Sequence, residues 1–135
     1  MKILIMGLPG SGKTYLAERL QPLIKSAWYN ADKVREMAGD WDFSDEGRQR
    51  QSKRMKTFAE FEKSQGRKVI CDFVCPTENT RKIFSPDITI WLDTIEKGRF
   101  DDTNKIFESP SSCDYHITEW KDDTHEIIAK ELLNV

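Results

Sequence analysis

The chain has 135 residues, of which 38% are hydrophobic and 33% are charged, and its formal net charge at pH 7 is −2. This length suits one domain, so we expect residues 1–135 to fold as a single unit. No stretch approaches the run of about 20 apolar residues that spans a bilayer. The slightly negative net charge gives no sign of general nucleic-acid binding, which favours an excess of basic residues. We therefore expect neither a membrane nor a nucleic-acid partner.

The first predicted elements are a buried strand and the helix that follows it. Residues 2–6 (KILIM) form a short apolar run, which is typical of a parallel strand buried on both faces. A helix is predicted over residues 13–26, and Pro22 should kink or shorten it. The apolar face of this helix is predicted to comprise Leu16, Ala17, Leu20, Leu23 and Ile24. Residues 27–30 then indicate a short second strand, and residues 31–38 indicate a short helix.

The middle of the chain is predicted to contain one long helix and two further strands. Ser44 is placed to cap a helix that ends at Gly66, a residue that favours a carboxy-terminal stop. Residues 68–74 (KVICDFV) and 88–93 (ITIWLD) indicate strands, and residues 77–84 between them indicate a short helix.

The last part of the chain has a weaker pattern. Residues 94–113 are polar and are predicted to be irregular, residues 115–117 indicate a last short strand, and residues 121–133 indicate an amphipathic helix. The alternation along the whole chain predicts an α/β fold in three layers, with a mostly parallel sheet of four or five strands and helices on both faces. The three cysteines, an odd number, are expected to be reduced thiols of a cytoplasmic protein.

The segment between the first strand and the first helix, GLPGSGKT, has the spacing of a phosphate-binding P-loop. Glycines let backbone amides approach phosphate oxygens, and the amides that open the helix add a site for an anion. We therefore expect a P-loop NTPase fold that binds ATP and Mg²⁺, with Lys13 acting on the β- and γ-phosphates and Thr14 on the metal. The residues expected to bind the nucleotide are Gly7, Leu8, Pro9, Gly10, Ser11, Gly12, Lys13 and Thr14. The strand and helix on either side disfavour the alternative, a glycine-rich turn without a ligand.

Two acidic residues fall where ligands collect in such folds, beyond the carboxyl ends of parallel strands. Asp32 follows the second strand, and a carboxylate near the γ-phosphate can accept the proton of an attacking hydroxyl group. We expect Asp32 to be catalytic, and the alternative is a helix cap. Asp72, inside the third strand, is expected to hold Mg²⁺ or its water, and the alternative is a hydrogen-bonded aspartate at a strand end.

One face of the predicted long helix, followed at helical spacing, carries polar residues near its start and apolar residues further along. It runs through Ser44, Arg48, Gln51, Met55 and Phe58. Because the later members are apolar and should face the sheet, Arg48 and Gln51 should lean over the same side, and we expect both to contact a ligand. The cations expected on the outer, solvated face are Arg50, Lys53 and Lys56.

Together these residues resemble the adenylylsulfate kinase family over roughly two-thirds of the chain. After the P-loop the family has an Asp-Asn-Val-Arg type of segment, matched by residues 32–35 (DKVR), and a Gly-Phe-Ser element, matched by residues 42–44 (DFS). It then has an arginine and, three residues on, an asparagine, matched by Arg48 and Gln51. A strand that ends in Phe-Ile-Ser-Pro is matched by residues 73–76 (FVCP).

This resemblance implies an activity and a set of residues. It implies transfer of the γ-phosphate of ATP to the 3′-hydroxyl group of adenylylsulfate, with Lys13 and Asp32 as the catalytic residues. It also implies that Phe43 stacks on the adenine of the acceptor. The residues that it assigns to the acceptor site are Asp32, Arg35, Phe43, Arg48, Gln51 and Cys75, and those that it assigns to the metal are Thr14 and Asp72.

The family also carries a mobile lid, rich in lysine and arginine, after its fourth strand. Here only residues 96–104 (EKGRFDDTN) correspond to it, and Lys97 and Arg99 are the cations left to act over the phosphates. Arg99 is therefore expected to bind the nucleotide, and the alternative is an ordinary polar loop. Lids exclude water and complete a site, so a shortened lid keeps other functions open.

Two alternatives are kept: a P-loop kinase for another hydroxyl acceptor, such as a nucleoside, a sugar or a modified base, and a non-catalytic nucleotide-binding module. The expected partner is a small-molecule substrate. A homodimer contact through Trp120 and residues 116–123 is also left open, with an ordinary helix start as the preferred interpretation.

Overall fold

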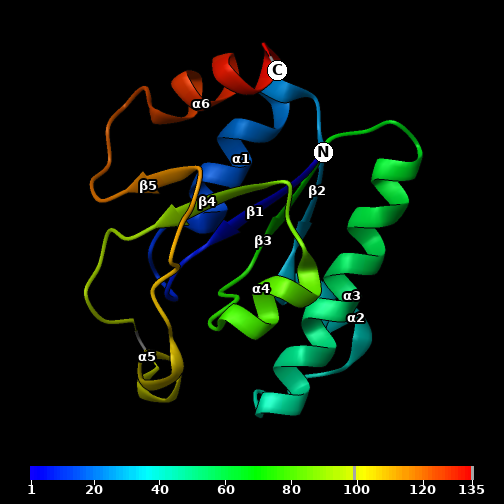
Figure 1. Cartoon of the computed structure of the whole chain (residues 1–135), viewed down its shortest axis with the longest axis vertical. Helices are drawn as coiled ribbons and strands as arrows, with labels where there is room; N and C mark the ends of the chain where they lie inside the picture. The colour runs from blue at the N-terminus through cyan, green and yellow to red at the C-terminus, as the bar shows by residue number, and fades with distance from the viewer. Residues whose placement is uncertain (99, 135) are drawn as a thin grey trace.

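A parallel sheet forms the middle layer of the structure, and helices cover both of its faces (Figure 1). The computed structural model describes residues 1–98 and 100–134. Within these residues the sheet has five strands in the order β2-β3-β1-β4-β5, and every neighbouring pair is parallel. The strands are β1 (Lys2–Met6), β2 (Ala27–Asn30), β3 (Val69–Asp72), β4 (Ile88–Leu92) and β5 (Tyr115–Ile117). The expected three-layer α/β architecture is confirmed.

The outer layers contain α1 (Lys13–Ile24), α2 (Ala31–Ala38), α3 (Asp45–Ser64), α4 (Glu78–Phe84), α5 (Asp101–Ile106) and α6 (Thr124–Leu133). Residues of α1 and α6 pack on one face of the sheet, and residues of α2, α3 and α4 pack on the other (Figure 1). None of the helices in the described residues combines the length and the apolar character that a membrane span requires.

The central strand β1 separates two hydrophobic cores. Ile3 and Ile5 join the core that contains α1 and α6, whereas Leu4 and Met6 join the core that contains α2, α3 and α4. All four side chains are fully buried. A strand with helices on both faces must be apolar at successive positions, which explains the continuous apolar run in this part of the sequence.

Helix α1 begins directly after the glycine-rich loop and ends two residues earlier than predicted. Lys25 adopts a left-handed conformation with φ 53°, and its backbone N–H donates to the carbonyl of Gln21, which ends the helix shortly after Pro22. The assignment of Leu23 to the apolar face is wrong, because its side chain is 42% exposed. Leu16, Leu20 and Ile24, spaced four residues apart, are buried and face the sheet. Leu23 points to one side of this row and is therefore partly in solvent.

Helix α3 starts and faces the sheet as predicted. The hydroxyl group of Ser44 accepts a hydrogen bond from the backbone N–H of Gly47 at 3.1 Å and so caps the helix. The helix ends at Ser64, two residues before Gly66. The predicted inward stripe is confirmed by the burial of Arg48, Gln51 and Met55.

The prediction that residues 94–113 are irregular is wrong in one part, because Asp101–Ile106 form α5. Its first turn carries Asp101 and Asp102, which suit the positive end of a helix dipole. A helix of this length is not stable in isolation, so tertiary contacts must hold it. One is made by Asn104, whose side chain accepts from the N–H of Gly98 at 2.7 Å and donates to its carbonyl at 3.0 Å.

Candidate active site

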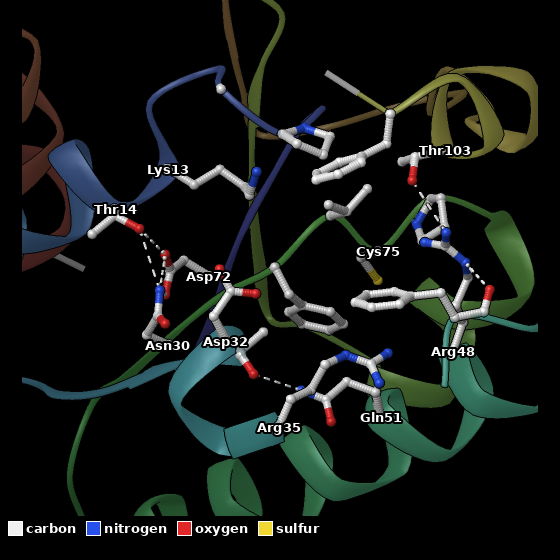
Figure 2. Close-up of a pocket in the computed structure, with 18 of the residues that line it drawn as sticks. Lys13, Thr14, Asn30, Asp32, Arg35, Arg48, Gln51, Asp72, Cys75 and Thr103 are labelled. Atoms are coloured by element: carbon white, nitrogen blue, oxygen red, sulfur yellow. Dashed lines mark hydrogen bonds between the residues drawn. The ribbon is translucent and has the colours of Figure 1, made fainter. Parts of the chain in front are cut away.

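A cavity of about 800 Å³ lies beyond the carboxyl ends of the strands, the position in which open parallel sheets bind ligands. Its walls come from the glycine-rich loop, the starts of α1 and α2, the first half of α3, the segment after β3, and α5. Figure 2 shows Lys13, Thr14 and Asp72 on one side of this cavity and Arg48 and Thr103 on the opposite side. We call the first side the loop end and the second the arginine end.

The glycine-rich loop is held in a compact turn at the loop end. The backbone N–H of Ser11 and the ammonium group of Lys13 both donate to the carbonyl of Leu8, at 3.0 and 3.1 Å. Gly12 has φ 102°, a conformation that residues with side chains rarely adopt. A methyl group added at Gly12 would lie 2.2 Å from Cζ2 of Trp120, so this indole ring packs directly on the loop.

Asp72 ends β3 with only 2% of its surface exposed. Its carboxylate accepts hydrogen bonds from Trp28 Nε1 at 2.9 Å, from Asn30 Nδ2 at 3.1 Å and from Thr14 Oγ1 at 3.1 Å. Burial raises the pKa of Asp72 above its ordinary value, and the three donors act against that rise. Thr14 and Asp72, the two residues expected at the metal, are thus hydrogen-bonded to each other, and Asp72 has the geometry of the alternative, a hydrogen-bonded aspartate at a strand end.

Asp32 lies in the first turn of α2, exposed to solvent, and lines the cavity. The alternative interpretation of this residue as the helix cap is wrong. The cap is Asn30, whose side-chain oxygen accepts from the backbone N–H of Lys33 at 3.1 Å. The carboxylate of Asp32 is therefore not used to start the helix.

Phe43 is contacted by two buried arginines at the arginine end. The guanidinium carbon of Arg35 lies 4.3 Å from the centre of the Phe43 ring, and that of Arg48 lies 5.5 Å from it. Arg48 Nε also donates to the Phe43 carbonyl at 2.9 Å, and Arg35 Nη1 donates to the carbonyls of Asp40 and Asp42. Burial lowers the pKa of both guanidinium groups, yet arginine keeps its charge in proteins. The aromatic face and the carbonyls replace the water that these cations lose.

Asp40 attaches the loop that carries Phe43 to α3 through ion pairs with two arginines. The Asp40 carboxylate accepts from Arg50 Nε at 2.7 Å and from Arg54 Nη2 at 2.8 Å. These hydrogen bonds hold the pKa of Asp40 well below its usual range. Arg50 lies on the outer face of α3 as predicted, but it is paired with Asp40 and Asp42 rather than only solvated.

Two other predicted residues, Gln51 and Cys75, also line the cavity. Gln51 Nε2 donates to the carbonyl of Ala31 at 3.1 Å and so joins α3 to the start of α2. Cys75 is buried and has φ 46°. Burial raises the pKa of its thiol to about 12, so the thiol is neutral near pH 7. Arg99, predicted to bind the nucleotide, lies outside the described residues.

The sequence reasoning missed the wall that α5 contributes. Phe100, Asp102 and Thr103 line the arginine end. Thr103 Oγ1 accepts a hydrogen bond from Arg48 Nη2 at 3.1 Å, although the two residues are 55 positions apart in the chain. The resemblance placed residues 96–104 over the phosphates as a shortened lid, but the polar composition of this segment gave no periodic signal for α5 or for its contact with Arg48.

Comparison with known proteins gives a family for this architecture. The model of the family described as adenylylsulphate kinase matches residues 1–92. A curated relative from Aeropyrum pernix, described as a probable adenylyl-sulfate kinase, is 36% identical over 88 residues. The match covers 58% of this chain and 46% of that protein, so the chain spans about half the length of the curated relative it matches.

Solved structures share the fold over almost the whole chain. The APS kinase of Mycobacterium tuberculosis in complex with AMPPNP and APS has a TM-score of 0.79 and 19% identity, with 98% of this chain and 95% of that chain covered. A shikimate kinase from Aquifex aeolicus has a TM-score of 0.66 and 20% identity, with 99% and 94% covered. At these identities the likeness concerns the fold, and the expected P-loop NTPase fold is confirmed.

We expect Gly12→Ala to abolish binding of a fluorescent ATP analogue, because a Cβ atom there both strains a left-handed backbone and collides with Trp120. Gly39→Ala is the matched control. Gly39 also has a positive φ, 63°, but an added methyl group meets no atom within 4 Å. This control should lose about 1–2 kcal/mol of stability and keep its nucleotide affinity. Unchanged nucleotide affinity in Gly12→Ala would contradict phosphate binding by the loop.

The pairing of Asp40 with Arg50 and Arg54 predicts a pH-dependent contribution to stability. Because its folded-state pKa is lowered, the contribution is full above the ordinary aspartate pKa of about 4 and is lost as the pH falls toward the lowered value. Asp40→Asn should therefore lower the thermal unfolding midpoint by a constant amount between about pH 5 and 8, and by less below about pH 4. A difference that does not shrink in acid would contradict this pairing.

Proposed function

We propose that this chain, which belongs to the adenylylsulphate kinase family, transfers the γ-phosphate of ATP to the 3′-hydroxyl group of adenylylsulfate, with residues 1–135 acting as one kinase domain. One observation carries the proposal: a P-loop and an aromatic ring held by two buried arginines open onto the same cavity. This combination suits a triphosphate donor at the loop end and an aromatic, anionic acceptor at the arginine end. The name of the Aeropyrum pernix relative and the AMPPNP and APS complex of the Mycobacterium tuberculosis enzyme support it.

At the loop end, the amides of residues 7–14 would hold the β- and γ-phosphates of ATP, with the charge of Lys13 beside them. The Thr14 hydroxyl group and the Asp72 carboxylate lie 3.1 Å apart, and oxygen ligands of this kind suit Mg²⁺. Mg²⁺ bound there would neutralise charge on the phosphate oxygens. Arg99 is a further proposed nucleotide ligand, on the ground of its place in the shortened lid.

At the arginine end, the exposed side of the Phe43 ring would stack on the adenine of the acceptor. The charges of Arg35 and Arg48 would attract its phosphosulfate group, because both guanidinium groups are buried and water therefore screens their charges less. Gln51 and Cys75 would also contact the acceptor, since both line the same cavity as Phe43.

Asp32 is proposed as the catalytic base, because it lines the cavity and is not used as the helix cap. Its carboxylate would take the proton of the 3′-hydroxyl group as that oxygen forms a bond to the γ-phosphorus. The bond from the γ-phosphorus to the bridging oxygen then breaks, and ADP leaves with its new charge near Lys13. Positioning and charge carry most of such a reaction, so the fixed walls of the cavity matter more than covalent chemistry.

A kinase for another hydroxyl acceptor is the second candidate. The side chains of Phe43 and Phe100 are 51% and 58% exposed, so the arginine end is open enough for a larger acceptor. A non-catalytic nucleotide-binding module is the third candidate. This third candidate does not explain why a carboxylate that is not a helix cap, Asp32, lines the same cavity as Arg35 and Arg48, and it is the weakest of the three.

We further propose that the chain works in the cytoplasm on small-molecule substrates, and a homodimer is its candidate assembly. One similar solved structure, the APS kinase of Thiobacillus denitrificans, is described as hexameric. Trp120 packs against Gly12 and makes an edge contact with Tyr15, with ring centres 5.2 Å apart. Trp120 is 40% exposed, but these two contacts within the chain favour its interpretation as a structural residue over a dimer contact.

The decisive experiment is ADP release measured by a coupled assay with ATP and Mg²⁺, in the presence of adenylylsulfate, a nucleoside or a sugar. We expect release to depend on adenylylsulfate. Release that depends instead on a nucleoside or a sugar would favour the second candidate. No dependence on any acceptor, at high substrate and with demonstrated ATP binding, would favour the non-catalytic module.

Two variants separate the proposed roles. Lys13→Ala should abolish ATP binding, whereas Asp32→Asn should keep it and lower kcat by about 100- to 10,000-fold, the usual contribution of a general base. The matched controls are Lys56→Ala and Asp122→Asn, which change exposed residues outside the cavity and should keep full activity. Loss of acceptor affinity alone in both Lys13→Ala and Asp32→Asn would contradict the assigned roles.

A further inference from the structure

We propose that Thr103 is a positioning residue for the acceptor: its hydroxyl group fixes the guanidinium group of Arg48 at the arginine end and thereby sets the affinity for an anionic acceptor. The inference rests on the proposed function, because it assumes that the acceptor binds beside Arg48. It concerns a residue that the sequence pattern did not single out.

The guanidinium group of Arg48 is held on two of its edges. Arg48 Nε donates to the carbonyl of Phe43 at 2.9 Å, and Arg48 Nη2 donates to Thr103 Oγ1 at 3.1 Å. The first bond alone leaves the plane of the group free to turn about that contact. The second bond, to a residue on another element, sets the direction in which the remaining N–H groups point.

The contact between Arg48 and Thr103 is buried, which increases its effect. The two residues are 9% and 5% exposed. A hydrogen bond from a charged donor is stronger than one between neutral groups, and a poorly hydrated surrounding strengthens it further. Loss of the acceptor oxygen would leave a buried charged donor without its partner, so the guanidinium group should move.

A neutral hydroxyl group suits this task better than a carboxylate. Asp102 is the neighbour whose charge acts on Arg48, yet the hydrogen bond of Nη2 goes to Thr103. A bond to a carboxylate would orient the guanidinium group and also neutralise much of its charge. A bond to a hydroxyl group orients it and leaves the charge available to an anion.

The helix that carries Thr103 is itself anchored to the phosphate loop. The side chain of Asn104 bridges the N–H and the carbonyl of Gly98, at 2.7 and 3.0 Å. Before that glycine, Thr94 Oγ1 donates to the carbonyl of Ser11 at 2.8 Å. Through these contacts, the described residues 94–98 connect the phosphate loop to α5.

The test compares Thr103→Val, which has nearly the same shape without the hydroxyl group, with Thr103→Ser, which keeps it. We expect Thr103→Val to raise the KM for adenylylsulfate about tenfold or more, the effect of losing one hydrogen bond to a charged group. The value of kcat should stay within about twofold of the wild type, because the ground state and the transition state lose the same contact with the acceptor. The KM for ATP should also stay within about twofold, and the thermal midpoint within a few degrees. Thr103→Ser should restore the KM for adenylylsulfate.

Thr57→Val is the matched control, because it makes the same chemical change on the exposed face of α3. An unchanged KM for adenylylsulfate in Thr103→Val would overturn the positioning role. So would a Thr103→Ser variant as impaired as Thr103→Val, since that result would assign the effect to packing of the methyl group. A wild-type chain that neither binds adenylylsulfate in calorimetry nor phosphorylates it would overturn the proposed function and this inference together, whereas an active wild type confines any failure to Thr103.

Discussion

A single buried carboxylate ties the sheet to the phosphate loop. Moving a charge away from water costs several kcal/mol unless hydrogen bonds replace its hydration, so Asp72 requires donors on every side. Two of them, Trp28 and Asn30, come from β2, and the third, Thr14, comes from the first turn of α1. The parallel register pairs Asn30 directly with Asp72. The start of α1 and the loop before it are therefore placed relative to the ends of β2 and β3.

The opposite side of the cavity is built on a different interaction. There the buried groups are cations, and an aromatic face, backbone carbonyls and, for Arg35, the Asp40 carboxylate at 3.9 Å stabilise them. Arg35 binds carbonyls of the loop between α2 and α3, and Arg48 binds the carbonyl of Phe43. The two guanidinium groups thus fix the aromatic ring and the loop that carries it. Phosphoryl transfer depends mainly on the relative placement of donor and acceptor, and this cavity fixes both sides of that arrangement to rigid elements.

Most of the elements could be predicted because their signals are local. The continuous apolar run of β1 reflects burial on two faces, and the stripe through Arg48 and Met55 reflects the period of a helix. The errors concern short or marginal features. Leu23 fits the apolar period but lies at its edge, and α5 is too short to show any period. The choice of Asn30 over Asp32 as the cap depends on where the chain leaves β2, which the residue types alone do not specify.

The sequence by itself determined the phosphate loop, since its glycines, lysine and threonine act through backbone geometry within eight consecutive residues. It also determined the α/β alternation, and through the family resemblance it indicated Arg35, Phe43 and Arg48. Only the tertiary structure decided how these groups meet. The contact of Arg48 with Thr103 spans 55 positions, and its formation depends on the packing of α5 against the rest of the fold rather than on any local pattern. Contacts between distant segments leave no periodic signal in the sequence, because each partner looks like an ordinary polar residue until the fold brings them together.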